Sequence, residues 1–228
     1  MKNSAFLLVN QEVLPQVFTK VIQAKEYLRT AQASSTTEAA KMAGIKIFVT
    51  GGIGGVHRGA SETFDISADL EELKNTDVTV VCAGVKSILD IPATLEYLET
   101  AGVPVISYGA DEFPAFYSRH SGCKTECSME DPKAIGSLIK AKHELGFKGA
   151  ILIGCPIPEE DEIPFEKMNE IIKKALKECE EKGIKGKRIT PFLLSKLNDL
   201  TEGKSLEANI KLVLNNADIG AKIAKNIY

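Results

Sequence analysis

Four apolar runs of strand length alternate with segments of helical spacing, and this alternation restricts the fold more than any other feature of the chain. The runs read IKIFVT at 45–50, VTVVCAG ending at Gly84, VPVISY at 103–108 and GAILIGCP at 149–156. Continuous apolar runs of this length are typical of parallel strands that are buried on both faces. The pattern predicts a three-layer α/β/α fold, in which helices cover both faces of a mostly parallel central sheet.

Helix start signals lie between these runs, where the crossover helices of a parallel sheet are expected. Ser67 opens SADLEELKNT as a potential N-cap, and residues from Asp90 to Gly102 have near-helical spacing. Asp131 followed by Pro132 is typical of an N-cap and the first helical residue. These signals predict the helices of successive βαβ units.

The two ends of the chain differ from this strand-containing middle. Three helices are predicted in the last third, at 165–183, after a cap at Thr190-Pro191, and at 204–227. Residues 1–35 form a divergent segment, in which the spacing of Val17, Ile22 and Leu28 predicts one helix. A length of 228 residues with 44% apolar content is enough for one core, so we expect a single domain over 1–228.

Composition excludes several classes of function. The chain has 28 basic and 31 acidic residues and no basic stripe, which argues against a nucleic-acid partner. No apolar stretch has the length of a membrane span or signal-peptide core, so we expect a soluble, cytoplasmic protein without membrane contact. Five cysteines, an odd number, favour reduced thiols. Cys123 and Cys127 are either a metal pair or ordinary loop thiols, and the lack of a second pair favours loop thiols.

The segment GGIGGVHRGA, residues 51–60, follows the first predicted strand. Ligands of open α/β sheets bind beyond the carboxyl ends of the strands, so this loop is placed where a ligand is expected. Its glycines allow backbone N–H groups to turn toward an anion, and His57 and Arg58 add charge-assisted hydrogen bonds to a phosphate. The alternative is a simple turn, because the glycine spacing matches neither the dinucleotide fingerprint nor the P-loop.

Lys86 follows the second predicted strand and precedes a helix. Ser87 and Asp90 have the spacing of a capping box, which predicts that this helix begins next to Lys86. The positive end of a helix dipole disfavours an ammonium ion and lowers the pKa of a lysine, which would make Lys86 a candidate nucleophile for Schiff-base chemistry. On this evidence alone, a lysine that extends into solvent is the stronger reading.

Two aspartates lie near the same predicted edge of the sheet. Asp65 and Asp69 are four residues apart in FDISADL, a spacing that suits a hard divalent cation whose remaining positions are filled by water. Helix capping explains the same residues equally well.

Several long blocks occur in a fixed order along the chain. They are IKIFVTGGIGGVHRGASETFDISADLEEL, VTVVCAGVKSILDIPATLEYLETAGVPVISY, FPAFYSRHSG and SLEANIKLVLNNA. Together they resemble the pseudouridine-5′-phosphate glycosidase family, from about residue 36 to the C-terminus. The resemblance implies reversible cleavage of the C–C glycosidic bond of pseudouridine 5′-phosphate to uracil and ribose 5-phosphate. A small-molecule nucleotide or sugar phosphate is therefore the expected partner, with one divalent cation, Mn²⁺, as cofactor.

The resemblance also assigns roles to individual residues. It implies that Lys86 is the Schiff-base nucleophile, attacking C1′ of the ring-opened sugar, and that Asp69 binds the metal. Thr50 and His57 match phosphate-loop positions, and Arg58 lies in the same loop. Asn209 matches a ligand-contacting asparagine. A homo-oligomer, a trimer, is implied as well.

Two features of the family have no clear match in this chain. Family members carry an ALESTIIAHG-like strand with a proton-transferring glutamate ahead of the matched region, and a second functional lysine in a KVSRRDLP-like stretch. The nearest match to that stretch is LVNQEVLP, with Leu8 at the lysine position and Gln11 and Glu12 in place of the arginines. We therefore expect an N-terminally truncated or diverged chain.

Three functional readings remain at this point. The first is a glycosidase in which Glu62 or Glu112 replaces the missing carboxylate, and the second is a catalytically impaired pseudoenzyme that binds a sugar phosphate or forms oligomers. A sugar-phosphate aldolase that uses Lys86 is a weaker third reading. Loss of the front layer is expected to expose a strand edge and an apolar face near 45–50, to be covered by residues 1–35 and by an oligomer.

Overall fold

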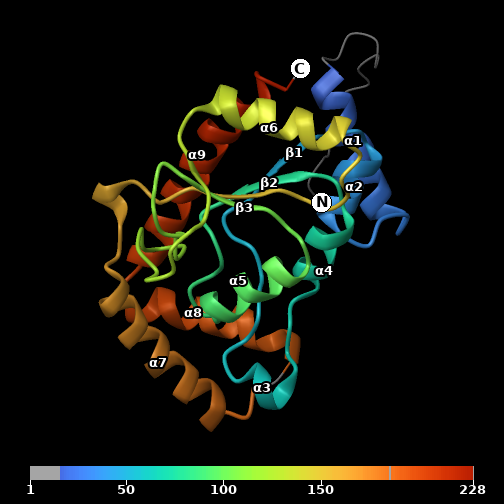
Figure 1. Ribbon diagram of the computed structural model, residues 1–228. Coiled ribbons are helices and arrows are strands. Elements are labelled where there is room, and N and C mark those ends of the chain that lie inside the picture. Colours follow the sequence, from blue (N-terminus) through green and yellow to red (C-terminus); the bar gives the residue numbers. More distant parts are fainter. Residues whose placement is uncertain (1–15, 185, 228) are drawn as a thin grey trace, which may run out of the picture. The chain divides into compact units, whose positions relative to one another are not determined.

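Figure 1 shows the computed structural model of the chain, which describes residues 16–184 and 186–227. Its contacts divide the chain into two compact units, Met1–Lys46 and Ile47–Tyr228. The single domain expected over 1–228 is not tested by this division and stays a prediction. In the first unit two helices pack against each other, α1 (Gln16–Arg29) and α2 (Thr36–Met42). The helix predicted from the spacing of Val17, Ile22 and Leu28 is thus confirmed as α1.

The second unit contains a parallel five-stranded sheet in the order β1-β2-β5-β3-β4. Four strands fall within the four apolar runs, and the two-residue β4 was not predicted. The strands are β1 (Ile47–Val49), β2 (Thr79–Cys82), β3 (Val105–Tyr108), β4 (Ser128–Met129) and β5 (Leu152–Gly154). β1 lies at an edge of this sheet, as expected for a strand edge near 45–50.

Helices of the second unit connect the strands and form its C-terminal third. Two short 3₁₀ turns, η2 (Glu159–Asp161) and η3 (Gly186–Arg188), lie between them. The helices are α3 (Ala60–Thr63), α4 (Ala68–Asn75), α5 (Ile91–Thr100), α6 (Pro132–Glu144), α7 (Phe165–Glu181), α8 (Ile189–Leu200) and α9 (Lys204–Ala224). Among the residues with assigned positions, none of the helices combines the length and the apolar character needed to cross a membrane.

The two faces of the sheet carry separate apolar clusters, which gives the predicted three layers. On one face, where Figure 1 shows α6 and α9, side chains of these two helices pack against Val81, Ile151 and Ile153. On the other face, side chains of α4, α5, α7 and α8 pack in a cluster with Val80 and Leu152. The α/β/α architecture is therefore confirmed.

α9 lies very close to the sheet. A Cβ atom at Gly220 would lie 2.6 Å from Cγ2 of Val49, so only glycine permits this approach of α9 to β1. The contact matters for the site, because α9 thereby reaches the loop that follows β1.

Two predicted N-caps are confirmed and two are wrong. Ser67 and Asp131 each accept a hydrogen bond from a backbone N–H in the first turn of α4 and α6. Ser87 does not begin a helix, because α5 starts only at Ile91, with Asp90 as its cap and Pro92 in its first turn. Thr190-Pro191 lies inside the first turn of α8 and does not cap it, because the preceding η3 turn leads directly into Ile189.

Candidate active site

The loops that follow β1 and β2 lie side by side at the carboxyl edge of the sheet. Ile53 N donates to Gly84 O at 3.1 Å, and Lys86 N donates to Ile53 O at 3.1 Å. These bonds continue the parallel pairing of β1 with β2 beyond the strand ends. The structure therefore places the glycine loop, defined here as residues 50–58, beside Lys86, as the resemblance implies.

Lys86 is half-buried within a stretch whose neighbours on both sides are buried. Its ammonium has no hydrogen-bond acceptor and no carboxylate partner among the residues that the structure describes. Because α5 begins five residues later, Lys86 lies in a turn and the argument from the helix dipole does not apply to it. The position of Lys86 favours it as a nucleophile, because it lies beside the glycine loop and no ion pair in the described part of the chain engages its ammonium.

A second potential nucleophile near this edge of the sheet, the thiol of Cys82, is unsuited to nucleophilic attack. Cys82 ends β2 and is fully buried, and burial raises the pKa of its thiol to about 12. A thiol with this pKa stays protonated near neutral pH and is a poor nucleophile. All five cysteines, including Cys123 and Cys127, are unbridged.

Side chains from distant segments hold the glycine loop in place. Val56 N donates to Oγ1 of Thr94 at 2.9 Å, and Gly54 N donates to Oδ2 of Asp69 at 2.7 Å. From α9, Nδ2 of Asn216 donates to the carbonyl oxygens of Thr50 and Gly51 at 2.9 and 3.2 Å. The loop is thus fixed from three sides, as a preorganised anion site requires.

His57 and Arg58, both predicted to bind phosphate, have different surroundings. His57 is half-buried, with Nδ1 3.8 Å from Oδ2 of Asp65. The guanidinium of Arg58 donates to Ser87 O and to Oδ1 of Asn169, both at 3.2 Å. Although part of the side chain is exposed, burial of the guanidinium lowers its pKa, and the charge of Asp90 opposes this effect. Arg58 therefore already connects the loop to the Lys86 turn and to α7.

Asp65 and Asp69 are oriented toward the glycine loop but have different partners. Asp69 uses one oxygen for Gly54 N, whereas Asp65 lies near His57. Within the described part of the chain, no group of three or more His, Cys, Asp or Glu side chains forms a complete metal site. A cation bound here would depend on carboxylate oxygens and on several waters or substrate oxygens, which Mg²⁺ and Mn²⁺ accept.

α9 contributes the predicted Asn209 and also Asn216, which sequence reasoning missed. Oδ1 of Asn209 lies 3.3 Å from the position that a Cβ atom at Gly51 would take, so this amide is next to the glycine loop. Asn216 was missed, although it lies in the block SLEANIKLVLNNA, because no local spacing links it to Thr50. Phe116 was also missed, and its ring packs directly against Gly52.

The block FPAFYSRHSG supplies a buried support behind the loop. Phe116 has a φ of 67°, which is rare for a residue with a side chain, and its N–H donates to Ala83 O at 2.9 Å. Its ring contacts that of Tyr117 edge to face. Burial raises the pKa of Tyr117 to about 12 against the opposing effect of a hydrogen bond from Ser205, so the phenol stays neutral.

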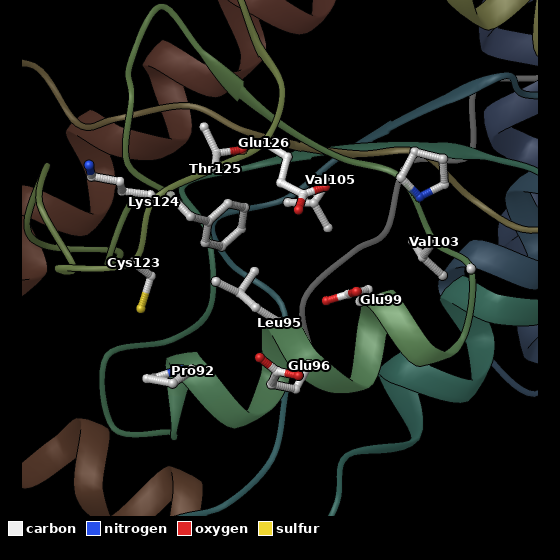
Figure 2. A pocket seen from close by; sticks show the side chains of 13 residues that line it. Pro92, Leu95, Glu96, Glu99, Val103, Val105, Cys123, Lys124, Thr125 and Glu126 are labelled. Carbon is white, nitrogen blue, oxygen red and sulfur yellow. The ribbon is translucent and has the colours of Figure 1, made fainter.

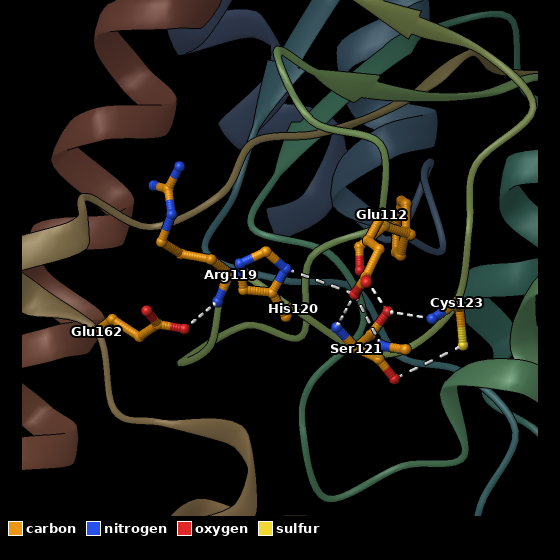
Figure 3. A network of polar contacts seen from close by, with 8 residues as sticks. Glu112, Arg119, His120, Ser121, Cys123 and Glu162 are labelled. Carbon is orange, nitrogen blue, oxygen red and sulfur yellow. Dashed lines mark hydrogen bonds and ion pairs between the residues drawn. The ribbon is translucent and has the colours of Figure 1, made fainter.

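The two glutamates proposed as the proton-transferring carboxylate, Glu62 and Glu112, occupy different settings. Glu112 belongs to the polar network of Figure 3, where Oε2 accepts hydrogen bonds from the N–H groups of Ser121 and Gly122 at 3.1 and 2.9 Å. Nδ1 of His120 lies 3.6 Å from the same oxygen. Glu62 is exposed on α3. Leu8, Gln11 and Glu12 lie outside the described residues.

A cavity of about 540 Å³ opens elsewhere in the second unit (Figure 2). Its wall combines apolar side chains of α5 and β3 with Glu96, Glu99 and Glu126. None of the predicted site residues lines it. Its size therefore gives no reason to move the candidate active site away from the glycine loop and Lys86.

Comparison with known proteins gives consistent matches over most of the chain. The sequence profile of the family described as "Indigoidine synthase A like protein" matches residues 17–226. A pseudouridine-5′-phosphate glycosidase of Caldanaerobacter subterraneus subsp. tengcongensis is 59% identical over 204 residues, which cover 90% of this chain and 66% of that protein. The corresponding Clostridium botulinum protein is 56% identical over 203 residues, covering 89% and 66%. The chain thus spans about two thirds of the length of these relatives.

Two solved structures share the fold. The prealnumycin C-glycosynthase AlnA, in complex with ribulose 5-phosphate, is 36% identical with a TM-score of 0.80, covering 86% of this chain and 64% of that one. An indigoidine synthase A-like protein of Thermotoga maritima is 36% identical with a TM-score of 0.77, covering 84% and 62%.

Proposed function

The chain belongs to the family of indigoidine synthase A-like proteins, and from this premise we propose that it acts as a pseudouridine-5′-phosphate glycosidase. The reaction is the reversible cleavage of the C–C glycosidic bond to uracil and ribose 5-phosphate. The observation that carries the proposal is the half-buried Lys86, without an ion-pair partner in the described residues, directly beside a fixed glycine loop. The sugar phosphate bound to AlnA supports a ligand of the same class.

Lys86 is proposed as the nucleophile because a C-glycoside has no leaving-group heteroatom to protonate. The neutral amine forms a bond to C1′ while the C1′–O4′ bond breaks and opens the sugar ring, and O4′ takes up the equivalent of the proton that the amine loses. The C1′–C5 bond then breaks, its electron pair stays on the uracil carbon, which takes up a proton, and the iminium of Lys86 remains at C1′. Water hydrolyses this iminium, which releases ribose 5-phosphate and restores the amine.

The glycine loop is proposed to hold the phosphate. Thr50, His57 and backbone N–H groups of the loop are the donors, and Asn209 approaches from α9. Arg58 contributes by connecting the loop to the turn that carries Lys86, through its bond to Ser87 O. A fixed phosphate orients the sugar, so that C1′ meets the amine in a defined geometry.

A divalent cation, Mn²⁺, is proposed as the cofactor. The donor chemistry fits, because Asp69 and its neighbour Asp65 offer hard carboxylate oxygens beside the anion site. When bound, the cation would neutralise charge on the substrate near these residues. Asp69 also holds Gly54 through its second oxygen, so the same side chain serves the loop and the metal.

A homo-oligomer, a trimer, is proposed as the working form, in the cytoplasm. Four large apolar side chains on α9 are between 40% and 62% exposed, an arrangement that favours association. They are Leu206, Ile210, Val213 and Leu214. The unbridged cysteines are consistent with a reducing compartment.

Uracil release from pseudouridine 5′-phosphate in the presence of Mn²⁺ tests the function. Turnover is expected in the wild type and should fall by at least about 10³-fold in Lys86→Met, because removal of a nucleophile abolishes the covalent route. Lys74→Met, which removes an exposed lysine from the last turn of α4, is the matched control and should retain activity. Ribose 5-phosphate binding without any uracil release would instead support the impaired pseudoenzyme.

A further inference from the structure

Asn216 is a fully buried amide whose position cannot be explained by packing alone. It lies on α9, and its Nδ2 group donates to the carbonyl oxygens of Thr50 and Gly51, 166 and 165 residues away in the sequence. Its Oδ1 has no hydrogen-bond partner in the described part of the chain. An unpaired buried acceptor lowers stability, so an apolar side chain of similar size would suit this place better if packing were its only role.

The two carbonyl groups determine where two N–H groups point. The Thr50 carbonyl shares its peptide unit with Gly51 N–H, and the Gly51 carbonyl shares its unit with Gly52 N–H. Both units are trans, so each N–H points away from its carbonyl oxygen. Gly51 O is fixed a second time, by Ala83 N at 2.8 Å. Asn216 and Ala83 thus turn both N–H groups away from α9 and β2.

Neither of these N–H groups is used within the structure. The N–H groups of Thr50, Ile53 and Gly54 all have acceptors, whereas those of Gly51 and Gly52 have none among the described residues. Two adjacent N–H groups that lack acceptors at the carboxyl end of a strand are available to bind an anion. A side chain at either position would also crowd its neighbours, since added Cβ atoms would lie 3.3 Å from Asn209 Oδ1 and 2.5 Å from Phe116 Cδ2.

We propose that the N–H groups of Gly51 and Gly52 are the backbone donors for the phosphate of the ligand, and that Asn216 is the positioning residue that aims them. The proposal rests on the proposed function in that the ligand is a sugar phosphate. Asn216 does not touch the ligand and acts only through the orientation of these two peptide units.

Selective labelling allows both amides to be observed in solution. The chain has 18 glycines, and Thr-Gly occurs once, at Thr50-Gly51, so ¹³C′-threonine with ¹⁵N-glycine identifies the Gly51 amide. Gly-Gly occurs at 51–52 and 54–55, so ¹³C′-glycine restricts Gly52 to one of two signals. On addition of inorganic phosphate at constant ionic strength, the amide protons of Gly51 and Gly52 should shift downfield. This wild-type measurement does not depend on how any variant folds.

Asn216→Leu tests the positioning role. It should weaken ribose 5-phosphate binding by about 10- to 100-fold, because donors that are misaimed by small amounts lose much of their effect. Binding of ribose, which lacks the phosphate, should be equal in Asn216→Leu and wild type, a selectivity that a general loss of structure would not produce. Asn215→Leu is the matched control, since Asn215 donates to Pro156 O instead, and it should bind like the wild type.

The outcomes separate this proposal from the proposed function. Phosphate-dependent shifts of Gly51 and Gly52 without cleavage of pseudouridine 5′-phosphate would support the donors and refute the glycosidase. Cleavage without these shifts, or equal loss of ribose and ribose 5-phosphate binding in Asn216→Leu, would overturn the role given to the two amides and to Asn216.

Discussion

At position 52 a side chain has no room. A Cβ atom there would lie 2.5 Å from Cδ2 of Phe116 and 3.0 Å from the carbonyl oxygen of Gly84. Phe116 cannot easily give way, because it is buried and its backbone already has a positive φ. The packing of Phe116 therefore requires a glycine at position 52, independently of ligand binding.

Gly52→Ala is expected to lower the free energy of unfolding by about 1–3 kcal/mol, the usual cost of overpacking a buried site. Urea unfolding measures the change. Gly51→Ala is the matched control in the same loop, where the nearest atoms lie 3.3 Å from the added Cβ and can move slightly, so its loss should be clearly smaller. Equal stabilities of Gly52→Ala and wild type would show that Phe116 is not a rigid support.

At the residue scale, the site residues that could be predicted from the sequence are those in the loops that directly follow a strand. Thr50 and Lys86 lie just after β1 and β2, and His57 lies in the loop that begins at Thr50, so the parallel sheet alone brings these loops together. Asn216 and Asn169 reach the loop from helices more than 100 residues away, and no spacing encodes such contacts. Those residues could be found only once the packing of α7 and α9 was known.

At the scale of elements, a cluster of hydrogen bonds and ion pairs connects several segments at the amino edge of the sheet. Lys142, in the last turn of α6, donates to Oδ1 of Asp77 at 3.1 Å and to the carbonyl oxygens of Phe147 and Gly149. His143 Nδ1 lies 2.9 Å from Oδ2 of Asp77. This cluster joins the start of β2 to the end of α6 and to the segment that leads into β5, far along the strands from Lys86.

Burial raises the pKa of Asp77, but the hydrogen bonds and charges of Lys142 and His143 lower it by more, so the net shift is downward. A carboxylate with a depressed pKa stabilises the fold above its ordinary value of 3.8, and that contribution is lost as the pH falls through the folded-state pKa. Asp77→Asn should therefore cost about 1–2 kcal/mol at pH 7, with the difference from wild type shrinking below about pH 4.

Urea unfolding of both proteins at pH 7, 5, 4 and 3 measures this dependence. Asp218→Asn, which breaks an exposed i, i+4 pair with Lys222, is the control and should change stability less. A stability difference between Asp77→Asn and wild type that stays constant over the whole range would contradict the assigned role of the carboxylate.

Most elements were predictable because their signals are local. Ser67 and Asp131 each precede a helical pattern directly, and both caps are observed. The start of α5 was misplaced because Ser87 and Asp90 are both capping residue types, and only Pro92 in the first turn favours Asp90. β4 has no sequence signal, since its two residues are strand only through their pairing with Ser107 and Tyr108.

At the scale of the whole molecule, the alternation of apolar runs and helical segments was enough to predict the layers. Helices that connect buried parallel strands must pack on both faces of the sheet, which gives three layers. The two apolar clusters lie on those two faces. The division into two units could not be predicted, because neither composition nor a linker-like segment marks position 46.

Borohydride trapping with ribose 5-phosphate tests most directly whether this fold presents Lys86 as an amine nucleophile. Reduction of the imine fixes the sugar phosphate on the lysine, and peptide mass mapping locates it. We expect one adduct on Lys86 in the wild type, the same adduct in Lys74→Met, and none in Lys86→Met. An adduct that persists unchanged in Lys86→Met, or maps to another residue in the wild type, would contradict the assignment of Lys86.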